Sequence, residues 1–426
     1  MRVLISAYAC EPDQGSEPGV GWHFVNAMSK HHQLWVLTQS DGRAAIEEAI
    51  AQRPNPNLNF VYFDPFSWQL DLWEAKAEIQ LHYYLWQIQA YFVGRSLHKT
   101  LQFDLTHHVT FVKYWGPSFL SLLPVPFLWG PVGGGESAPK AFWHDFSWRG
   151  KVYETLRETA RWVGEQDPFT RLTARRSTLS QATTADTADR LRCIGADPIQ
   201  VVSQVGLSAA EILQLGACAP PTSEKIRFVS VGRLLHWKGF HLSLRAFLQA
   251  DLPEAEYWLL GDGPERSRLE AIAQSSQAAD GVKFFGSRPR SEVLEKLSQC
   301  HVMVHPSLHD SGGWACVEAM AAGRPVICLD LGGPAVQVTA ETGIKVVANT
   351  PEQAVRDIST AMQRLSAERS LLVQMGQKAQ QRVKDVFNWE SKACQTAQIY
   401  EKICANQSRA INDSNFKFQT TDTRNS

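Results

Sequence analysis

The feature that most constrains this chain is an alternation of short apolar runs with longer amphipathic runs, which begins twice. The first series has apolar runs at 2–9, 34–38, 59–63, 105–110, 126–129, 182–185 and 199–205. The second series has them at 226–231, 256–260, 282–285, 301–305, 326–329 and 344–347. Short Val-, Ile- and Leu-rich runs separated by helical patterns are typical of parallel strands covered on both faces. We therefore predict an α/β protein with two doubly wound, Rossmann-like domains.

The length supports this division, because 426 residues exceed what one hydrophobic core usually serves. Residues 207–225 contain Pro220 and Pro221 among small residues, which favours a linker, and the last residues lack apolar periodicity. The predicted parts are a first domain (1–206), a linker (207–225), a second domain (226–386), a final helix (387–404) and a disordered tail (405–426).

The charge balance argues against a nucleic-acid partner. Lys and Arg number 42 and Asp and Glu 43, a net charge of -1, whereas a general nucleic-acid binder needs a basic surplus. The 8 cysteines form no C-x-x-C pair, which indicates a reducing, cytoplasmic compartment. The most apolar stretch, 119–129, is interrupted by Pro124 and Pro126 and is too short for a membrane-spanning helix.

Two basic residues follow the first strand of the second series. Arg233 and Lys238 lie in a loop at the carboxyl end of that strand, where open α/β sheets bind ligands. A guanidinium fork and an ammonium together suit a diphosphate. The alternative interpretation is a pair of solvated surface cations.

A second cluster begins at Asp310 and ends at Gly323-Arg324-Pro325, which closes a predicted helix. Ser311, Gly312 and Gly313 place backbone amides at the N-terminus of this helix, where anions and hydroxyls bind. Glu318 lies further along, on an otherwise apolar helix, and needs a partner such as a ribose diol. The alternatives are a plain N-cap for Asp310 or Ser311 and a Glu318 satisfied by backbone amides.

The first domain offers two glycine turns. Gly15 belongs to a G-x3-G-x-G turn between the first strand and the first helix, which lets backbone approach a ligand. Gly134 and Gly135 precede Glu136 in a second turn, and we expect Glu136 to face an acceptor cleft. An ordinary turn and a surface glutamate are the alternatives.

Two adjacent histidines, His107 and His108, lie on a predicted strand of the first domain. Neighbouring strand residues point to opposite faces, so at most one of the two rings faces the cleft. A structural role is the alternative for either ring.

The segment 142–176 interleaves aromatic and basic residues, among them Trp148, Arg149 and Trp162. This pattern suits peripheral contact with a membrane surface or a lipid-linked acceptor. Acidic residues dilute the pattern, and helices that cover a sheet would look similar.

These motifs, in this order, resemble those of the retaining glycosyltransferases of the GT-B fold, family 4. Asp310 and Glu318 resemble the family's E-x7-E region, with Asp in place of the first Glu, and Arg233 and Lys238 resemble its diphosphate clamp. Segments 260–264, 285–287 and 331–334 resemble its remaining glycine turns. The family often has H-x-H where this chain has His107 and Val109.

The resemblance implies a GT-B fold in which two domains face a cleft and the final helix crosses back to the first domain. It implies a retaining hexosyltransferase that moves a sugar from a UDP- or GDP-sugar to a hydroxyl of a glycan, glycolipid or lipid-linked acceptor. The implied catalytic residues are Arg233, Lys238, Asp310, Glu318 and His107 or His108; Gly15, Gly286, Ser287, Ser311, Gly312 and Gly313 would join them at the donor, and Gly134, Gly135 and Glu136 at the acceptor. We expect no metal and no cofactor, since two fixed cations face the leaving diphosphate and no D-x-D occurs near it.

Two other functions stay open. A non-catalytic nucleotide-sugar-binding protein would keep Arg233, Lys238 and Glu318. An NAD-dependent oxidoreductase shares the sheet topology, and Asp41 lies at a suitable distance from the first glycine turn, but the glycine spacing argues against it.

Overall fold

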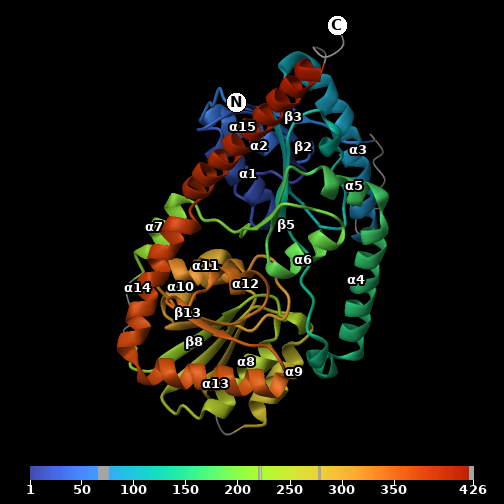
Figure 1. Ribbon diagram of the computed structural model, residues 1–426. Helices are drawn as coiled ribbons and strands as arrows, with labels where there is room; N and C mark the ends of the chain where they lie inside the picture. The colour runs from blue at the N-terminus through green and yellow to red at the C-terminus, as the bar shows by residue number, and fades with distance from the viewer. Residues whose placement is uncertain (66–75, 219–220, 222, 277–279, 422–426) are drawn as a thin grey trace.

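The computed structural model describes residues 1–65, 76–218, 221, 223–276 and 280–421, and these form two α/β domains (Figure 1). Every strand pair within each sheet is parallel. The predicted pair of doubly wound domains is therefore confirmed. The carboxyl ends of the strands in each sheet lie at a common edge, which is where ligands of such sheets bind.

In the described residues the first sheet has seven strands in the order β3-β2-β1-β4-β5-β6-β7. Its strands are β1 (Arg2–Ala7), β2 (Gln33–Thr38), β3 (Leu58–Tyr62), β4 (Leu105–Thr110), β5 (Phe127–Val132), β6 (Leu179–Ala182) and β7 (Ile199–Val201). The second sheet, counted over the same residues, has six strands in the order β10-β9-β8-β11-β12-β13. Its strands are β8 (Ile226–Val231), β9 (Ala255–Leu260), β10 (Val282–Gly286), β11 (Val302–His305), β12 (Val326–Leu329) and β13 (Gly343–Val346).

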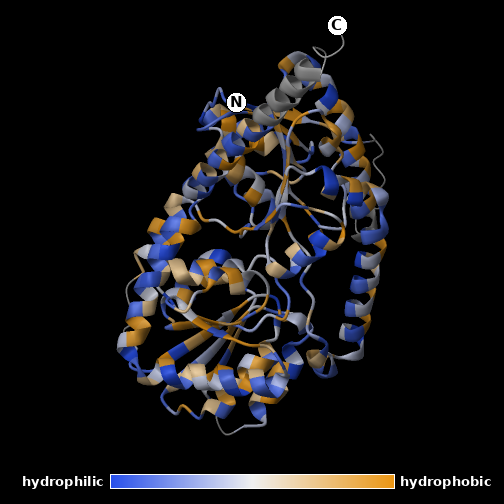
Figure 2. Cartoon of the chain, in the orientation of Figure 1, coloured by the Kyte–Doolittle hydropathy of each residue, from blue (hydrophilic) through white to orange (hydrophobic). Residues whose placement is uncertain are grey.

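Helices cover both faces of the two sheets, and several of them, such as α13, alternate hydrophilic and hydrophobic residues along their length (Figure 2). Those that begin before the second sheet are α1 (Ser16–Met28), α2 (Arg43–Gln52), α3 (Lys76–Leu101), η1 (Phe119–Leu122), η2 (Lys140–Asp145), α4 (Trp148–Gln166), α5 (Pro168–Arg176), α6 (Ala185–Cys193) and α7 (Ala209–Gly216). Those that follow are η3 (His236–Lys238), α8 (Phe240–Ala250), α9 (Arg266–Gln274), α10 (Arg290–Ser298), α11 (Trp314–Ala321), α12 (Gly332–Gln337), α13 (Pro351–Ala367), α14 (Arg369–Val386) and α15 (Trp389–Thr421).

The chain crosses between the domains earlier than the sequence indicates. After β5 it enters the second domain, where Phe142 and Phe146 are buried in the same apolar core as Phe240 and Leu242 of α8. Helix α4 then runs back along the side of the molecule to the first domain (Figure 1). Residues 138–146 therefore belong by packing to the second domain, although the predicted boundary at 206 assigns them to the first.

The predicted linker is not an extended connection throughout. Ser208 caps α7 by accepting from the Glu211 backbone N–H, and Glu211 accepts from the Ser208 N–H in return. Ile212 and Leu215 of α7 are buried in the core of the second domain. Residues 209–216 thus form a packed helix, because the capping box and the apolar pair outweigh the small-residue composition around them.

The final helix joins the two domains from outside. Helix α15 begins at Trp389 and crosses onto the first domain, where Trp389 and Tyr400 are buried against α1 (Figure 1). It extends to Thr421 and so includes most of the residues that the sequence analysis assigned to a tail (405–426). No Gly or Pro, the two residues least favourable within a helix, occurs between Trp389 and Thr421.

Candidate functional site

The centre of the site is an ion pair between two loops of the second domain. Lys238 closes η3 after β8, and Asp310 lies between β11 and α11. The Lys238 Nζ lies 2.5 Å from Asp310 Oδ2, and His305 Nε2 lies 3.2 Å from the same oxygen. Burial acts to raise the pKa of the Asp310 carboxyl, but Lys238 and His305 outweigh burial and hold the pKa far below its usual range.

The loop amides are already occupied in this structure. Gly312 and Gly313 donate their backbone N–H groups to Asp310 Oδ1 at 3.2 and 3.1 Å. Asp310 therefore acts as an N-terminal cap that orders the loop, and the prediction of bare amides at the start of α11 is wrong for these two residues. Gly313 also adopts a φ of +65°, in which a side chain would be strained.

Arg233 stands apart from this network. Its side chain is exposed at the carboxyl end of β8 and forms no hydrogen bond or ion pair within the described part of the chain. Of the two predicted clamp residues, Lys238 is thus engaged by Asp310, whereas the Arg233 guanidinium remains available to an incoming anion.

Glu318 has a charged partner rather than the backbone amides of the alternative interpretation. Arg290, the first residue of α10, places Nη2 2.7 Å from Glu318 Oε1 and 2.7 Å from Glu211 Oε1. Burial raises the pKa of Glu318, and the Arg290 charge opposes that rise. Gly286 and the exposed Ser287 lie just before α10, the helix that Arg290 begins.

The glycine loop of the first domain is open. Gly15 precedes α1 and is exposed, and an added Cβ there would meet no atom within 4 Å. Glu17 follows it and accepts the Phe111 backbone N–H at 2.9 Å. Burial raises the pKa of Glu17 and lowers the pKa of the nearby Lys113 to about 8. Sequence analysis singled out the glycine turn that contains Glu17 but assigned no role to Glu17 or to Lys113.

The second glycine turn packs against the protein itself. A Cβ on Gly134 would lie 2.6 Å from the Trp115 ring, and a Cβ on Gly135 would lie 2.4 Å from the Thr187 Cα. The Gly134 N–H donates to the Ser311 hydroxyl at 3.2 Å, which connects the two domains. Close backbone approach therefore explains these glycines, as expected, but the approaching groups are side chains and backbone of the chain itself.

Glu136 does not face an open cleft. It is 1% exposed, and its Oε1 accepts hydroxyl hydrogens from Thr183, Thr184 and Thr187, while Ser311 donates to Oε2 at 2.6 Å. The prediction of an acceptor-facing carboxylate is wrong in this arrangement. Four hydroxyls satisfy the charge, so Glu136 joins the Ser311 loop to the first domain.

Both predicted histidines are interior. His107 Nε2 donates to the Gly130 carbonyl at 2.6 Å and its Nδ1 accepts from the Tyr400 hydroxyl at 2.6 Å; burial lowers its pKa to about 4. His108 lies on the opposite face of β4, beside Tyr83 at 3.2 Å, and burial lowers its pKa to about 3. The alternation along the strand is as expected, but neither ring reaches the cleft, so a catalytic role for either is not supported by the geometry.

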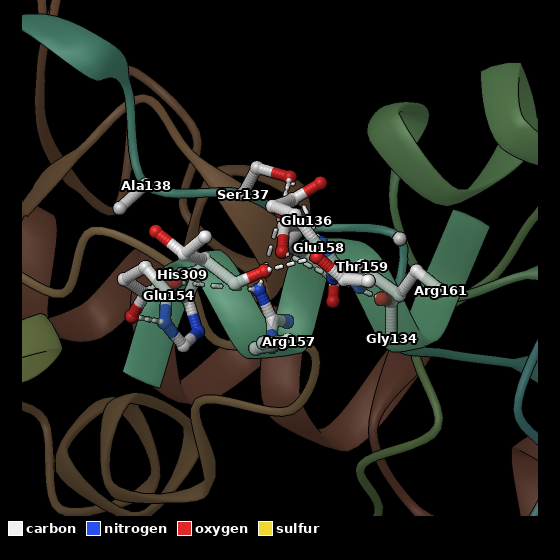
Figure 3. Close-up of polar contacts among 12 residues, drawn as sticks. Gly134, Glu136, Ser137, Ala138, Glu154, Arg157, Glu158, Thr159, Arg161 and His309 are labelled. Carbon is white, nitrogen blue, oxygen red and sulfur yellow. Dashed lines mark hydrogen bonds and ion pairs between the residues drawn. The ribbon is translucent and has the colours of Figure 1, made fainter. Parts of the chain in front are cut away.

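An inter-domain cluster escaped sequence analysis. Glu154 of α4 is fully buried, and its Oε1 accepts from the Nε2 atoms of His236 and His309, both at 3.0 Å. Figure 3 shows Glu154 beside His309. His236 lies in η3 two residues before Lys238, and His309 precedes Asp310. One carboxylate from the first domain thus fixes both loops that carry the central ion pair.

A buried arginine supports the same junction. Arg161 of α4 donates to the carbonyls of Gly134 and Glu136 and lies 2.7 Å from Glu158 Oε1 (Figure 3). Helix α4 therefore holds the Gly134–Glu136 turn and, through Glu154, the loops of the second domain. The sequence offered one signal, since acidic residues recur inside the aromatic and basic segment 142–176.

The described residues contain no cluster of three or more His, Cys, Asp or Glu side chains placed to hold a metal ion. Within those same residues, no helix has both the length and the apolar character needed to cross a bilayer.

Comparison with solved structures identifies the architecture. Sucrose-phosphate synthase from Thermosynechococcus elongatus superimposes with a TM-score of 0.61 over 95% of this chain and 99% of its own, at 19% identity. The lipopolysaccharide outer core galactosyltransferase WaaB gives a TM-score of 0.62 over 94% and 100%, at 14% identity. The chain has the GT-B fold. HepE of Anabaena, solved in complex with UDP, gives a TM-score of 0.58 over 94% and 99%, at 16% identity.

The match to a protein family falls in the second domain. Residues 219–382 match the family Glycosyl transferases group 1. The 2-deoxystreptamine glucosyltransferase of Streptomyces kanamyceticus is 35% identical over 24% of this chain and 27% of its own length. The alpha-maltose-1-phosphate synthase of Mycolicibacterium smegmatis is 31% identical over 41% and 47%. The chain spans less than half the length of these curated relatives.

Proposed function

We propose that this protein is a retaining, family 4 hexosyltransferase that moves a sugar from a UDP- or GDP-sugar to a hydroxyl acceptor. The observation that carries the proposal is the grouping of Arg233, Lys238–Asp310 and Glu318 at the carboxyl edge of the second sheet. This edge is where open α/β sheets bind ligands, and it lies in the part that matches group 1 glycosyltransferases.

In the proposed reaction the nucleoside diphosphate leaves as the glycosidic bond breaks, and negative charge develops on its oxygens. The exposed Arg233 guanidinium would bind those oxygens, and the Lys238 ammonium, which Asp310 holds in place, would supply a second positive charge. The Asp310 carboxylate holds Lys238 in place before the donor arrives, so little reorganisation is needed during the reaction. These two cations perform the role of a metal, and the proposal includes no cofactor.

For the acceptor we propose a glycan or a lipid-linked glycan. An exposed apolar stripe on α4 supports the lipid-linked form, because Trp148 and Leu156 are 71% and 64% exposed and Arg149 and Lys151 lie beside them. Side chains of these kinds rest together at membrane surfaces. This stripe of α4 would bring the protein to the membrane surface, where a lipid-linked acceptor resides.

A thermal-shift panel of UDP, GDP, ADP and NAD at equal concentration tests donor binding. We expect UDP or GDP to raise the melting temperature, since a ligand at 100 times its Kd stabilises by about 2.7 kcal/mol. A shift with NAD alone would favour the oxidoreductase, and no shift with any nucleotide would contradict the proposed site. Release of UDP or GDP from a matching nucleotide sugar then separates an enzyme from a non-catalytic binding protein.

We expect Glu318→Gln to weaken UDP or GDP binding about tenfold, which corresponds to about 1.4 kcal/mol. The amide retains a hydrogen-bond acceptor for Arg290 but loses the charge that would hold the ribose hydroxyls. Glu295→Gln, on the exposed face of α10, is the control and should bind like the parent. If Glu318→Gln melts far below the parent while its folded fraction binds nucleotide normally, Glu318 is structural.

A further inference from the structure

A cavity lies where the two domains meet α15, away from the Lys238–Asp310 pair. Its volume is about 470 Å³, which is within the range of small-molecule sites. Its walls include Phe24 and Gln181 of the first domain, Arg382 of the second, and Trp389 and Lys392 of α15.

The charge in this cavity has one sign. Among the described residues that line it, the charged ones are Arg382, Lys392 and Lys402, and none is acidic. The Lys392 ammonium donates to the Ser203 carbonyl. The Arg382 guanidinium donates to the carbonyls of Gln337 and Val336 at 2.8 and 3.2 Å. Carbonyl oxygens orient these cations without neutralising them.

Arg382 and Lys392 are half-buried, and Lys402 is exposed. Partial burial of a cation is costly unless an anion compensates for it. Burial lowers the pKa of Lys392 to about 8 and also lowers the pKa of Arg382, which agrees with the absence of a carboxylate partner for either residue in the described part of the chain. The cavity therefore has the charge that an anionic ligand requires.

The remaining walls indicate what the anion carries. Five amide side chains line the cavity, and they can donate to and accept from hydroxyl groups: Gln181, Gln200, Gln204, Gln395 and Gln398. Phe24 and Trp389 also line the cavity, but both are nearly buried and the Trp389 ring stacks on His23. We propose that this cavity binds a phosphorylated sugar, with the phosphate at Lys392 and Arg382 and the hydroxyls at the glutamine amides.

One lining residue of the cavity, Gln204, lies next to the loop that carries Gly312. A Cβ on Gly312 would lie 3.5 Å from the Gln204 amide nitrogen, and the Gln337 side chain donates to the Gly312 carbonyl. Arg382 in turn binds the Gln337 carbonyl. A ligand in the cavity would contact both domains and the residues that hold Gly312, so it would act as a regulator distinct from the donor and the acceptor.

Titration calorimetry with glucose 1-phosphate, glucose 6-phosphate and inorganic phosphate tests this site. We expect at least one sugar phosphate to bind the parent and to bind Lys392→Met at least tenfold more weakly. The control Lys378→Met, exposed on α14 outside the cavity, should bind like the parent, and so should Arg233→Ala. Met keeps most of the length of Lys and removes the charge, and a melting curve checks that each variant is folded.

Three outcomes would overturn the proposal: no binding to the parent, equal binding to Lys392→Met, or loss of binding in Arg233→Ala, which would place the ligand in the donor cleft. Inorganic phosphate that binds as tightly as either sugar phosphate would overturn the assignment of the sugar. A second measurement is independent of the variants. A bound sugar phosphate should protect Lys392, and not Lys378, from reductive methylation detected by mass spectrometry.

Discussion

Replacement of Arg233 by Ala should lower the transfer rate about a hundredfold, equivalent to about 3 kcal/mol of transition-state stabilisation. The same change should leave the free energy of unfolding almost unaltered. The Arg233 side chain is exposed and has no hydrogen-bond or ion-pair partner in the described residues, so its removal breaks no interaction within the chain. The measurement is kcat with the preferred nucleotide sugar, beside a urea titration of each variant.

The control for Arg233→Ala is Arg95→Ala, which removes an exposed arginine from α3. It should keep both the parent activity and the parent stability. Arg233→Lys adds a second test, because a lysine keeps the charge but not the bidentate geometry and should recover only part of the rate. If Arg233→Ala retains activity within a few-fold of the parent, the assignment of Arg233 to the diphosphate is wrong.

Local sequence order was sufficient to predict the features that repeat or lie close together in the chain. The apolar runs identified most strands of both sheets, because a strand buried on both faces needs a continuous apolar sequence. The run predicted at 182–185 was wrong: β6 is Leu179–Ala182, and Thr184 caps α6. Asp310 and Glu318 were singled out by position relative to one predicted helix. Gly313, with its positive φ, does begin that helix, and Glu318 does have a polar partner, although the partner is Arg290.

Local sequence patterns could not predict which side chains from distant segments contact each other. Nothing near Glu136 in the sequence indicates that Thr183, Thr184, Thr187 and Ser311 surround its carboxylate. The sequence allows His107 to face the cleft. In the structure its Nδ1 accepts a hydrogen bond from the Tyr400 hydroxyl, nearly 300 residues away in the chain. Charge and hydrogen-bonding capacity can be read from a single residue, but whether the partner is a ligand or another side chain depends on the tertiary fold.

Glu154 provides the clearest test of how the domain junction supports the site. Glu154→Ala should destabilise the protein by about 3 kcal/mol, because it leaves His236 and His309 buried without their shared acceptor. Glu154→Gln should cost less, since an amide oxygen can accept from both rings. Glu48→Ala, on the exposed surface of α2, is the control and should change stability little.

The pH dependence of the free energy of unfolding shows whether the Glu154 carboxyl is ionised or neutral in the folded protein. Burial acts to raise its pKa, but the hydrogen bonds from His236 and His309, with the charges of His309 and Arg157, outweigh burial and lower the pKa from 4.5 to about 2. A carboxyl whose pKa is lower in the folded state stabilises the fold above about pH 4.5, and this contribution is lost as the pH falls toward 2.

The Gln variant has no carboxyl at this position, so the difference in stability between the parent and Glu154→Gln should shrink over that interval. Burial also lowers the pKa of His309, so both proteins lose some further stability as the pH falls below the ordinary histidine range. Because both keep His309, this contribution largely cancels in the difference. A difference that stays constant from pH 6 to pH 2.5 would mean that Glu154 is not ionised, and that the two loops of the site are held by packing against α4 instead.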